Sequence, residues 1–237
     1  MQYFKILKLF VFIYISLCSF SILYAKTNEL ELNSRWSNYL KTTIGKEAAF
    51  ILLKSLDFIE PQTDNKQAIE LGSGIGNETE KLLQMGWNVL AIDPDEFANQ
   101  FMQKRFKKIL NSKSNSLVIK NTKFEDISEL PNSKLTFALN TLMFMDHKKF
   151  PEFWKKITNS LDQNGIFCGT FFGSKHQLKR GKNSPIIFRL SKKSVENLFS
   201  SYEILYFREE IEKDQKSSDS WKSNQYEHKF FIIARKN

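Results

Sequence analysis

Short apolar runs alternate with amphipathic stretches along most of the chain after residue 65. The apolar runs are short and bounded by polar or turn residues, which predicts strands at 67–71, 88–93, 116–121, 135–140 and 165–173. The stretches at 77–86, 95–110 and 151–161 carry apolar residues at helical spacing, and Pro151 is typical of a first helical turn. Such alternation predicts an α/β fold of βαβ units with a mostly parallel sheet.

The two ends of this region depart from the alternation. Residues 33–61 place Phe50, Leu53 and Leu56 at helical spacing, which predicts N-terminal helices ending before Pro61. Near the other end, 202–210 and 228–236 read as strands, with a polar stretch between them that has no apolar helical period. Two strands without a crossover helix must pair antiparallel, so the sheet is expected to end in an antiparallel strand.

The first 25 residues have a different composition. Lys5 and Lys8 precede an uncharged apolar run that ends at Ala25, as in a signal peptide. We therefore expect residues 1–25 to direct export, to the periplasm or outside the cell, and residues 26–237 to form one domain. An uncleaved membrane anchor is the alternative, although about 17 apolar residues span only about 25 Å as a helix.

Composition and charge narrow the class of protein. The chain has 237 residues, 41% hydrophobic and 26% charged, as expected of one globular domain. Its net charge of +9 is carried mostly by lysine, without basic runs interleaved with aromatic residues, so we expect no nucleic-acid partner. Cys18 and Cys168 form neither a disulfide framework nor a metal motif. We expect a monomer without a bound metal.

The stretch AIELGSGIGNET, residues 68–79, is the first candidate for chemistry. Gly72, Gly74 and Gly76 lie between a predicted strand and a predicted helix, where an open parallel sheet binds nucleotide-like ligands. Asp93 ends the next predicted strand, the position from which an acid contacts a ribose. The alternative role for Asp93 is to cap the helix that begins near residue 95.

The acid ahead of the glycines distinguishes between possible ligands. Glu70 would repel a pyrophosphate but suits the ammonium group of an amino acid. In addition, Asn77 occupies the position of the third glycine in the dinucleotide-binding pattern. S-adenosylmethionine carries an ammonium and a sulfonium and no phosphate, so it is the ligand that this pattern favours.

Residues 68–98 resemble the first two motifs of the class I S-adenosylmethionine-dependent methyltransferases. The resemblance continues through FEDI, LTFALNTLMFM and the terminal HKFFIIARK, and is greatest to the tellurite-resistance and thiopurine-type small-molecule enzymes. It implies a Rossmann-like sheet of seven strands, mostly parallel with an antiparallel last strand and helices on both faces. It also implies S-adenosylmethionine as the cofactor.

The resemblance assigns roles to individual positions of this sequence. Asn140 matches the position beside the transferred methyl group, and His228 matches a histidine near the end of the subgroup. Lys123 stands where an acid often precedes the adenine-binding pair. The cofactor positions implied by the resemblance are Glu70, Gly72, Ser73, Gly74, Gly76, Asp93, Pro94, Phe124 and Glu125.

The acceptor side is less constrained by the sequence. We expect Asn140, His176 and His228 to be its catalytic residues, with a structural role as the alternative for each histidine. Arg180 and Arg189 are candidates to hold an anionic acceptor. The segment around Trp36 and the polar stretch 214–226 are expected to close over the cofactor.

Methyl transfer needs an oriented, dry site rather than a metal or a catalytic triad. Because no separate recognition domain is evident, we expect a small-molecule methyl acceptor. The alternative is an exported, catalytically inactive protein that uses the same fold to bind a partner or act as an effector.

Overall fold

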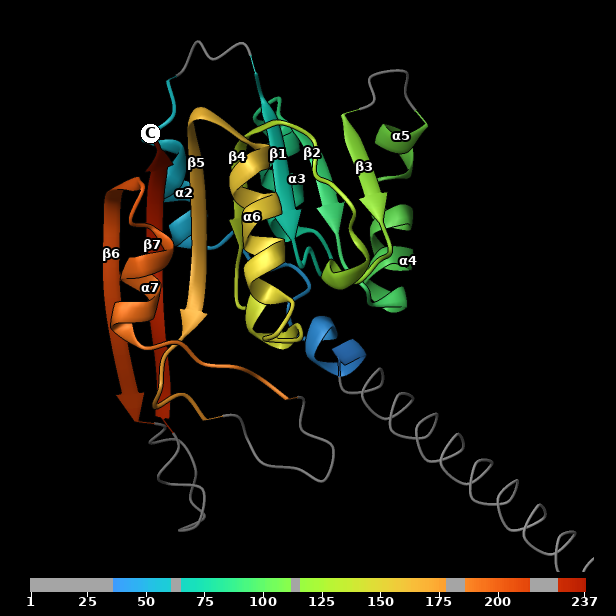
Figure 1. Cartoon of the computed structure of the whole chain (residues 1–237). Coiled ribbons are helices and arrows are strands. Elements are labelled where there is room, and N and C mark those ends of the chain that lie inside the picture. The colour runs from blue at the N-terminus through green and yellow to red at the C-terminus, as the bar shows by residue number, and fades with distance from the viewer. Residues whose placement is uncertain (1–35, 61–64, 112–115, 178–185, 214–225) are drawn as a thin grey trace, which may run out of the picture.

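The computed structural model describes residues 36–60, 65–111, 116–177, 186–213 and 226–237. Seven strands form one sheet in the order β3-β2-β1-β4-β5-β7-β6 (Figure 1). The strands are β1 (Gln67–Leu71), β2 (Asn88–Ile92), β3 (Leu117–Lys120), β4 (Ser133–Ala138), β5 (Leu161–Phe172), β6 (Tyr202–Lys213) and β7 (Tyr226–Lys236).

The pairing of the strands confirms the predicted fold class. Neighbouring strands from β3 to β5 are parallel, whereas β7 runs antiparallel to both β5 and β6. The chain moves outward from β1 to β3 and then returns to the other side of β1 with β4. The carboxyl ends of β1 and β4 therefore flank the switch point at which open α/β sheets bind their ligands.

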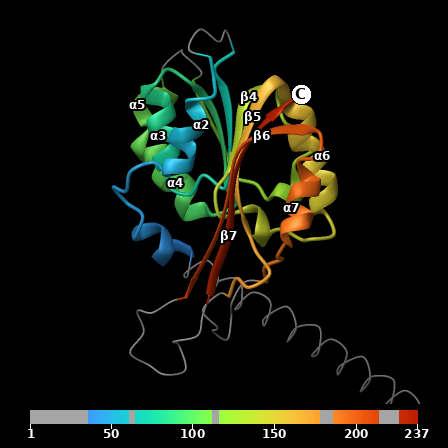
Figure 2. The same cartoon turned by 90° about the vertical axis from the view of Figure 1, so that its left-hand side faces the viewer.

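Helices cover both faces of the sheet, as predicted. Helices α2 to α5 lie on one face, and α6 and α7 lie on the other (Figure 2). Residues 36–41 form a further helical segment beyond the carboxyl ends of β1 and β4 (Figure 1). The helices are α2 (Phe50–Leu56), α3 (Asn77–Gln84), α4 (Glu96–Arg105), α5 (Lys107–Leu110), α6 (Phe150–Ser160) and α7 (Lys192–Leu198), with short 3-10 turns η1 (Phe124–Asp126) and η2 (Leu142–Phe144).

Two details of the helices differ from the prediction. The single helix expected over 95–110 is divided at Phe106, whose φ and ψ of −102° and 16° end α4 before α5 begins. Helix α7 was not predicted, because only Val195 of its seven residues is fully buried and the apolar signal is weak. The predicted helix at 151–161 is observed as α6, and Gly72, Gly74 and Gly76 lie between β1 and α3 as predicted.

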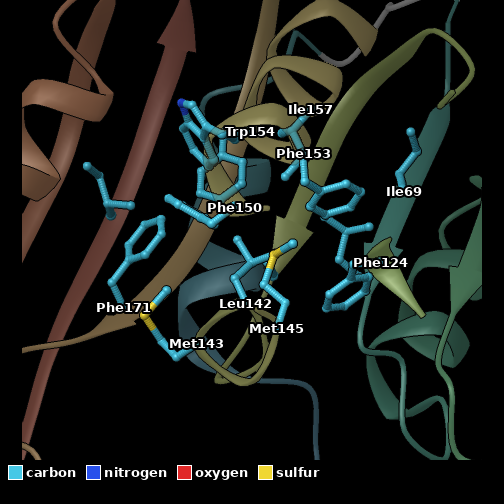
Figure 3. Packing of buried hydrophobic residues seen from close by; sticks show 14 of the residues in the cluster. Ile69, Phe124, Leu142, Met143, Met145, Phe150, Phe153, Trp154, Ile157 and Phe171 are labelled. Atoms are coloured by element: carbon cyan, nitrogen blue, oxygen red, sulfur yellow. The ribbon is translucent and has the colours of Figure 1, made fainter. Parts of the chain in front are cut away.

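The core lies on both sides of the sheet. On one side α6 packs an aromatic and aliphatic stripe against β4 and β5 (Figure 3). On the other side, Ile51 and Leu52 of α2 pack over β5 and β7, and the Cys168 thiol donates to the Ile51 carbonyl at 3.3 Å. Burial on both faces explains why β1, β4 and β5 read as nearly continuous apolar runs. No helix within the described ranges is long and apolar enough to cross a membrane.

Candidate functional site

The glycine turn lies between β1 and α3 and has little space for side chains. Gly72, Gly74 and Gly76 all have left-handed backbones, with φ of 78°, 51° and 80°. The Gly72 amide donates to the Ile92 carbonyl at 2.7 Å, which ties the turn to the end of β2. A Cβ on Gly72 would overlap the Thr141 side chain, which follows β4. Glycine is therefore required at residue 72 for conformation and for space.

Asp93 joins the turns that follow β1 and β2. Its Oδ2 accepts from the Gly74 amide and its Oδ1 from the Asp95 amide, both at 2.8 Å. Burial raises the pKa of Asp93, while these two hydrogen bonds oppose the shift. Asp95 caps α4 by accepting from the Ala98 amide at 2.8 Å. The capping role considered for Asp93 is thus filled by Asp95, and Asp93 holds the glycine turn.

Glu70 is a buried acid without a cationic partner in the described part of the chain. It is 3% exposed, and the Thr79 hydroxyl of α3 donates to its Oε2. Burial, reinforced by the nearby Glu78, raises its pKa well above the ordinary value. Since a buried carboxylate is costly unless it has a partner, this position is suited to a bound cation.

The remaining cofactor candidates have more varied surroundings. The Ser73 hydroxyl points to the Met102 sulfur at 3.5 Å, so it is directed into the core. Pro94 is exposed beside Asp93. Phe124 stacks on Phe153 of α6 with ring centroids 5.3 Å apart and is mostly buried. The Glu125 Oε1 accepts from the Asp146 amide at 2.8 Å and so fixes the loop after η2.

Asn140 follows β4 with a left-handed backbone, at a φ of 55°. Asparagine tolerates this conformation better than most residues, and the backbone amide of Asn140 donates to the Thr170 hydroxyl of β5 at 2.6 Å. The bend ends β4, leaves Asn140 exposed and directs the next residue, Thr141, onto Gly72. Asn140 therefore lies between the glycine turn and the end of β5.

His176 and His228 come together although 52 positions separate them. The His228 amide donates to His176 Nδ1 at 3.3 Å. Both side chains are buried, at 4% and 3% exposure. Because β7 is antiparallel, His228 near its start lies at the same edge of the sheet as the end of β5. Of the two arginines considered for this region, Arg189 donates to the His176 carbonyl, and Arg180 lies outside the described residues.

A row of four rings runs along this edge from the N-terminal helical segment to β5. Trp36 meets Phe144 edge-on at 4.9 Å, and Phe144 meets Phe172 edge-on at 5.9 Å. Phe172 stacks parallel on His176, with centroids 3.8 Å apart. Phe172 was not singled out from the sequence because an aromatic residue in an apolar strand normally signals only burial.

The N-terminal helical segment connects this row to the glycine turn. Leu40 packs against Ile75 and Ala98, beside the turn, while Trp36 reaches Phe144 on the other side of the switch point. The Asn77 side chain donates to the Thr43 carbonyl at 2.8 Å and holds the segment there. The candidate cofactor and acceptor residues thus share one edge of the sheet. No cluster suited to a metal ion occurs among the described residues.

Comparisons with known proteins agree with this geometry. A family profile described as "Methyltransferase domain" matches residues 69–169, the part that contains the glycine turn, Asp93 and Asn140. No curated protein sequence matched the chain. The resemblance seen in the sequence is therefore confirmed at the level of this domain.

Solved structures show the same fold at low sequence identity. TehB from Haemophilus influenzae has a TM-score of 0.66 at 15% identity, covering 85% of this chain and 67% of its own. A Burkholderia thailandensis 1,6-didemethyltoxoflavin-N1-methyltransferase with bound 1,6-didemethyltoxoflavin and S-adenosylhomocysteine has a TM-score of 0.54 at 13% identity, covering 86% and 78%. The cyclase SpnF has a TM-score of 0.57 at 11% identity, covering 78% and 79%. These similarities establish the fold, and the cyclase shows that the fold alone does not define the reaction.

Proposed function

We propose that this chain, whose residues 69–169 match a methyltransferase domain, transfers a methyl group from S-adenosylmethionine to a small-molecule acceptor. The observation that carries the proposal is the pair of acids around the glycine turn. Glu70 and Asp93 end neighbouring strands, and neither meets a lysine or arginine within the described residues. The buried Glu70 disfavours a pyrophosphate, and the two acids together favour a ligand with a cationic end and free hydroxyls.

The residues of this edge fit such a cofactor. Glu70 would hold the ammonium end, and the charge of the bound cation would favour its ionised form, opposing the burial that raises its pKa. Asp93 has lone pairs left after two amide bonds, so it would accept hydrogen bonds from ribose hydroxyls. The lack of a side chain at Gly74 would allow a ligand to approach the main chain beside Leu40. When bound, S-adenosylmethionine supplies an electrophilic methyl carbon.

The rest of the edge would orient the acceptor and exclude water. Asn140 places a polar side chain at the switch point, and the row from Trp36 to His176 supplies apolar surface beside it. Alignment of two reactants in such a site is worth on the order of 7–11 kcal/mol. A small-molecule acceptor is consistent with the toxoflavin-type substrate named for one structural neighbour.

Calorimetry with S-adenosylmethionine, S-adenosylhomocysteine and NADH tests the cofactor. Asp93→Ala is expected to weaken S-adenosylmethionine binding by about 1.5–3 kcal/mol, the usual effect of losing a charged hydrogen-bond partner. Asp126→Ala is the matched control. Asp126 is an exposed acid in η1, which follows β3, the strand next to β2 in the sheet. Equal affinity of the Asp93 variant and the parent chain for S-adenosylmethionine would show that the assigned cofactor is incorrect. Tighter binding of NADH than of S-adenosylmethionine would show the same.

Turnover separates an enzyme from a protein that only binds. Incubation of the chain with methyl-labelled S-adenosylmethionine and a library of small aromatic and heteroatom acceptors should give labelled products. Tight cofactor binding without product from any acceptor would favour the inactive alternative.

We propose that residues 1–25, which lie outside the described residues, act as a signal peptide. The support is the basic and then apolar composition of the segment. Mass spectrometry of exported protein should find a chain that begins near Lys26. Only full-length protein in the membrane fraction would favour the anchor. Export would also require that the protein meet its cofactor in a compartment that contains it.

A further inference from the structure

His228 has no ring nitrogen left for a ligand. The Lys175 amide donates to its Nδ1 at 3.2 Å, so Nδ1 carries no proton. The proton therefore resides on Nε2, which lies 2.9 Å from Glu209 Oε1 of β6. The ring also lies against Gly173, where any Cβ would overlap it. His228 is thus fixed on three sides by β5, β6 and the turn after β5.

Hydrogen bonding also determines which ring nitrogen of His176 carries the proton. Its Nδ1 accepts from the His228 amide, so the neutral ring carries its proton on Nε2. Among the described residues, no side chain accepts a hydrogen bond from this Nε2–H. The parallel stack on Phe172 holds the plane of the ring. Burial and the nearby Lys229 lower the pKa of His176 to about 4, which keeps it neutral in ordinary buffers.

We propose that His176 presents its Nε2–H to the methyl acceptor as a hydrogen-bond donor. In this proposal the backbone amide of His228 fixes the tautomer of His176, and the His228 ring, oriented by Glu209, positions the turn that carries His176. The proposal rests on the proposed function and adds to it. Through its backbone amide His228 sets which nitrogen of His176 is protonated, and through its ring it anchors the turn that carries His176. Glu209 in turn orients the His228 ring.

A consequence concerns the class of acceptor. Neither histidine has a free lone pair, so neither is placed to remove a proton from the acceptor. The acceptor must therefore arrive with an available lone pair, as an anion or a soft neutral heteroatom. In the transfer this lone pair forms the bond to the methyl carbon, the electron pair of the carbon–sulfur bond goes to sulfur, and no proton has to move.

The charged groups around His176 and His228 are Lys175, Arg189, Lys192, Glu209, Glu227 and Lys229.

Nitrogen-15 NMR of the full chain labelled at histidine tests the tautomers directly. At pH 7 we expect His176 and His228 both as Nε2–H forms, with His176→Asn and His228→Asn giving the assignments. Lowering the pH to about 5.5 should leave His176 neutral, because that is above the value of about 4 given for its pKa. An Nδ1–H form of His176, or its protonation in this range, would overturn the proposal.

A second measurement uses two probe acceptors, 4-nitrothiophenolate and 4-nitrophenolate, with S-adenosylmethionine. Saturating probe should shift the Nε2–H signal of His176, and His176→Ala should lower kcat/KM for the probe about 10- to 100-fold, as expected for a hydrogen bond to a charged group. The affinity for S-adenosylmethionine should not change. An unshifted signal with both probes, or full kcat/KM in His176→Ala, would overturn the proposal.

Variants of the neighbouring acids separate positioning from general structural damage. Glu209→Ala should give a mixture of His228 tautomers and a lower kcat. Glu209→Gln keeps an acceptor oxygen, so this variant should retain the single Nε2–H tautomer of His228 and the kcat of the parent chain. Glu210→Ala is the control, because Glu210 is the next residue of β6 and pairs with Arg208 instead. Equal effects of Glu209→Ala and Glu210→Ala would count against the role of Glu209. Failure of the chain to bind S-adenosylmethionine at all would instead refute the proposed function.

Discussion

Glu70 and Asp93 lie near each other, but the protein satisfies the two acids differently. Asp93 accepts two backbone amides, which offset part of the effect of burial. Within the described residues, Glu70 has hydrogen bonds from Thr79 alone, and the unfavourable charges of Glu78 and Asp93 lie nearby. In the free protein Glu70 is therefore the group that favours its protonated form, and a bound cation would reverse that preference.

This difference predicts a pH dependence of stability. Because the folded-state pKa of Glu70 is raised above its ordinary value of 4.5, the folded protein holds a proton that the unfolded chain releases. The free energy of unfolding must then fall as the pH rises above about 4.5, until the folded-state pKa is passed. Glu70→Gln removes the ionisation, so chemical unfolding at about pH 5 and about pH 8 should show a smaller decline. Glu47→Gln, at an exposed site, should keep the parent's decline; the same decline in Glu70→Gln would contradict the prediction.

Two glycines with nearly equal φ allow a second comparison. Gly72 and Gly86 have φ of 78° and 79°, but a Cβ would overlap Thr141 at Gly72 and would meet no atom within 4 Å at Gly86. Gly86→Ala should lower the free energy of unfolding by about 1–2 kcal/mol, the cost of the left-handed backbone. Gly72→Ala should lower it further, because a packed side chain or the turn must move. Urea unfolding measures both, and equal losses would mean that the contact with Thr141 is not important.

Helix α6 illustrates stability at the level of an element. Trp154 meets Phe167 and Phe199 edge-on at 5.0 and 5.1 Å, and so joins the helix to β5 and to the residue that ends α7. Trp154→Ala should lower the free energy of unfolding by about 3–5 kcal/mol through lost burial and the cavity it leaves. The exposed neighbouring substitution Lys155→Ala should change it by no more than about 0.5 kcal/mol. Similar midpoints in urea for both variants would contradict this.

The elements also show what the sequence can and cannot reveal. The strands, the glycine turn and the antiparallel end were predictable because burial on both faces leaves continuous apolar runs and because glycine marks left-handed turns. Helix α7 was missed because most of it faces solvent. The link from Glu209 to His228 was not predictable, since 19 residues separate them and only strand pairing brings them together.

At the scale of the whole molecule, the N-terminal segment connects the two halves of the candidate site. Its contacts with Ile75 and Phe144 are few, which is typical of a segment that opens locally. S-adenosylhomocysteine should slow hydrogen exchange over residues 36–45 as well as at the glycine turn. The second segment expected to close, 214–226, lies outside the described residues except for Tyr226.

The turn at Gly86 is the internal control for this exchange experiment. It follows α3 and precedes β2, at the opposite edge of the sheet, so its exchange should not respond to the ligand. Protection confined to residues 72–76 would contradict closure by the N-terminal segment.

The position of β7 has a consequence for biosynthesis. Of the seven strands, β7 is the last to be synthesised, yet it lies between β5 and β6. Until it emerges from the ribosome, one side of β5 is uncovered and β6 lacks the strand with which it pairs in the described part of the chain. A nascent chain must therefore pass through an incomplete, aggregation-prone state, during which a chaperone can capture it before folding closes the sheet.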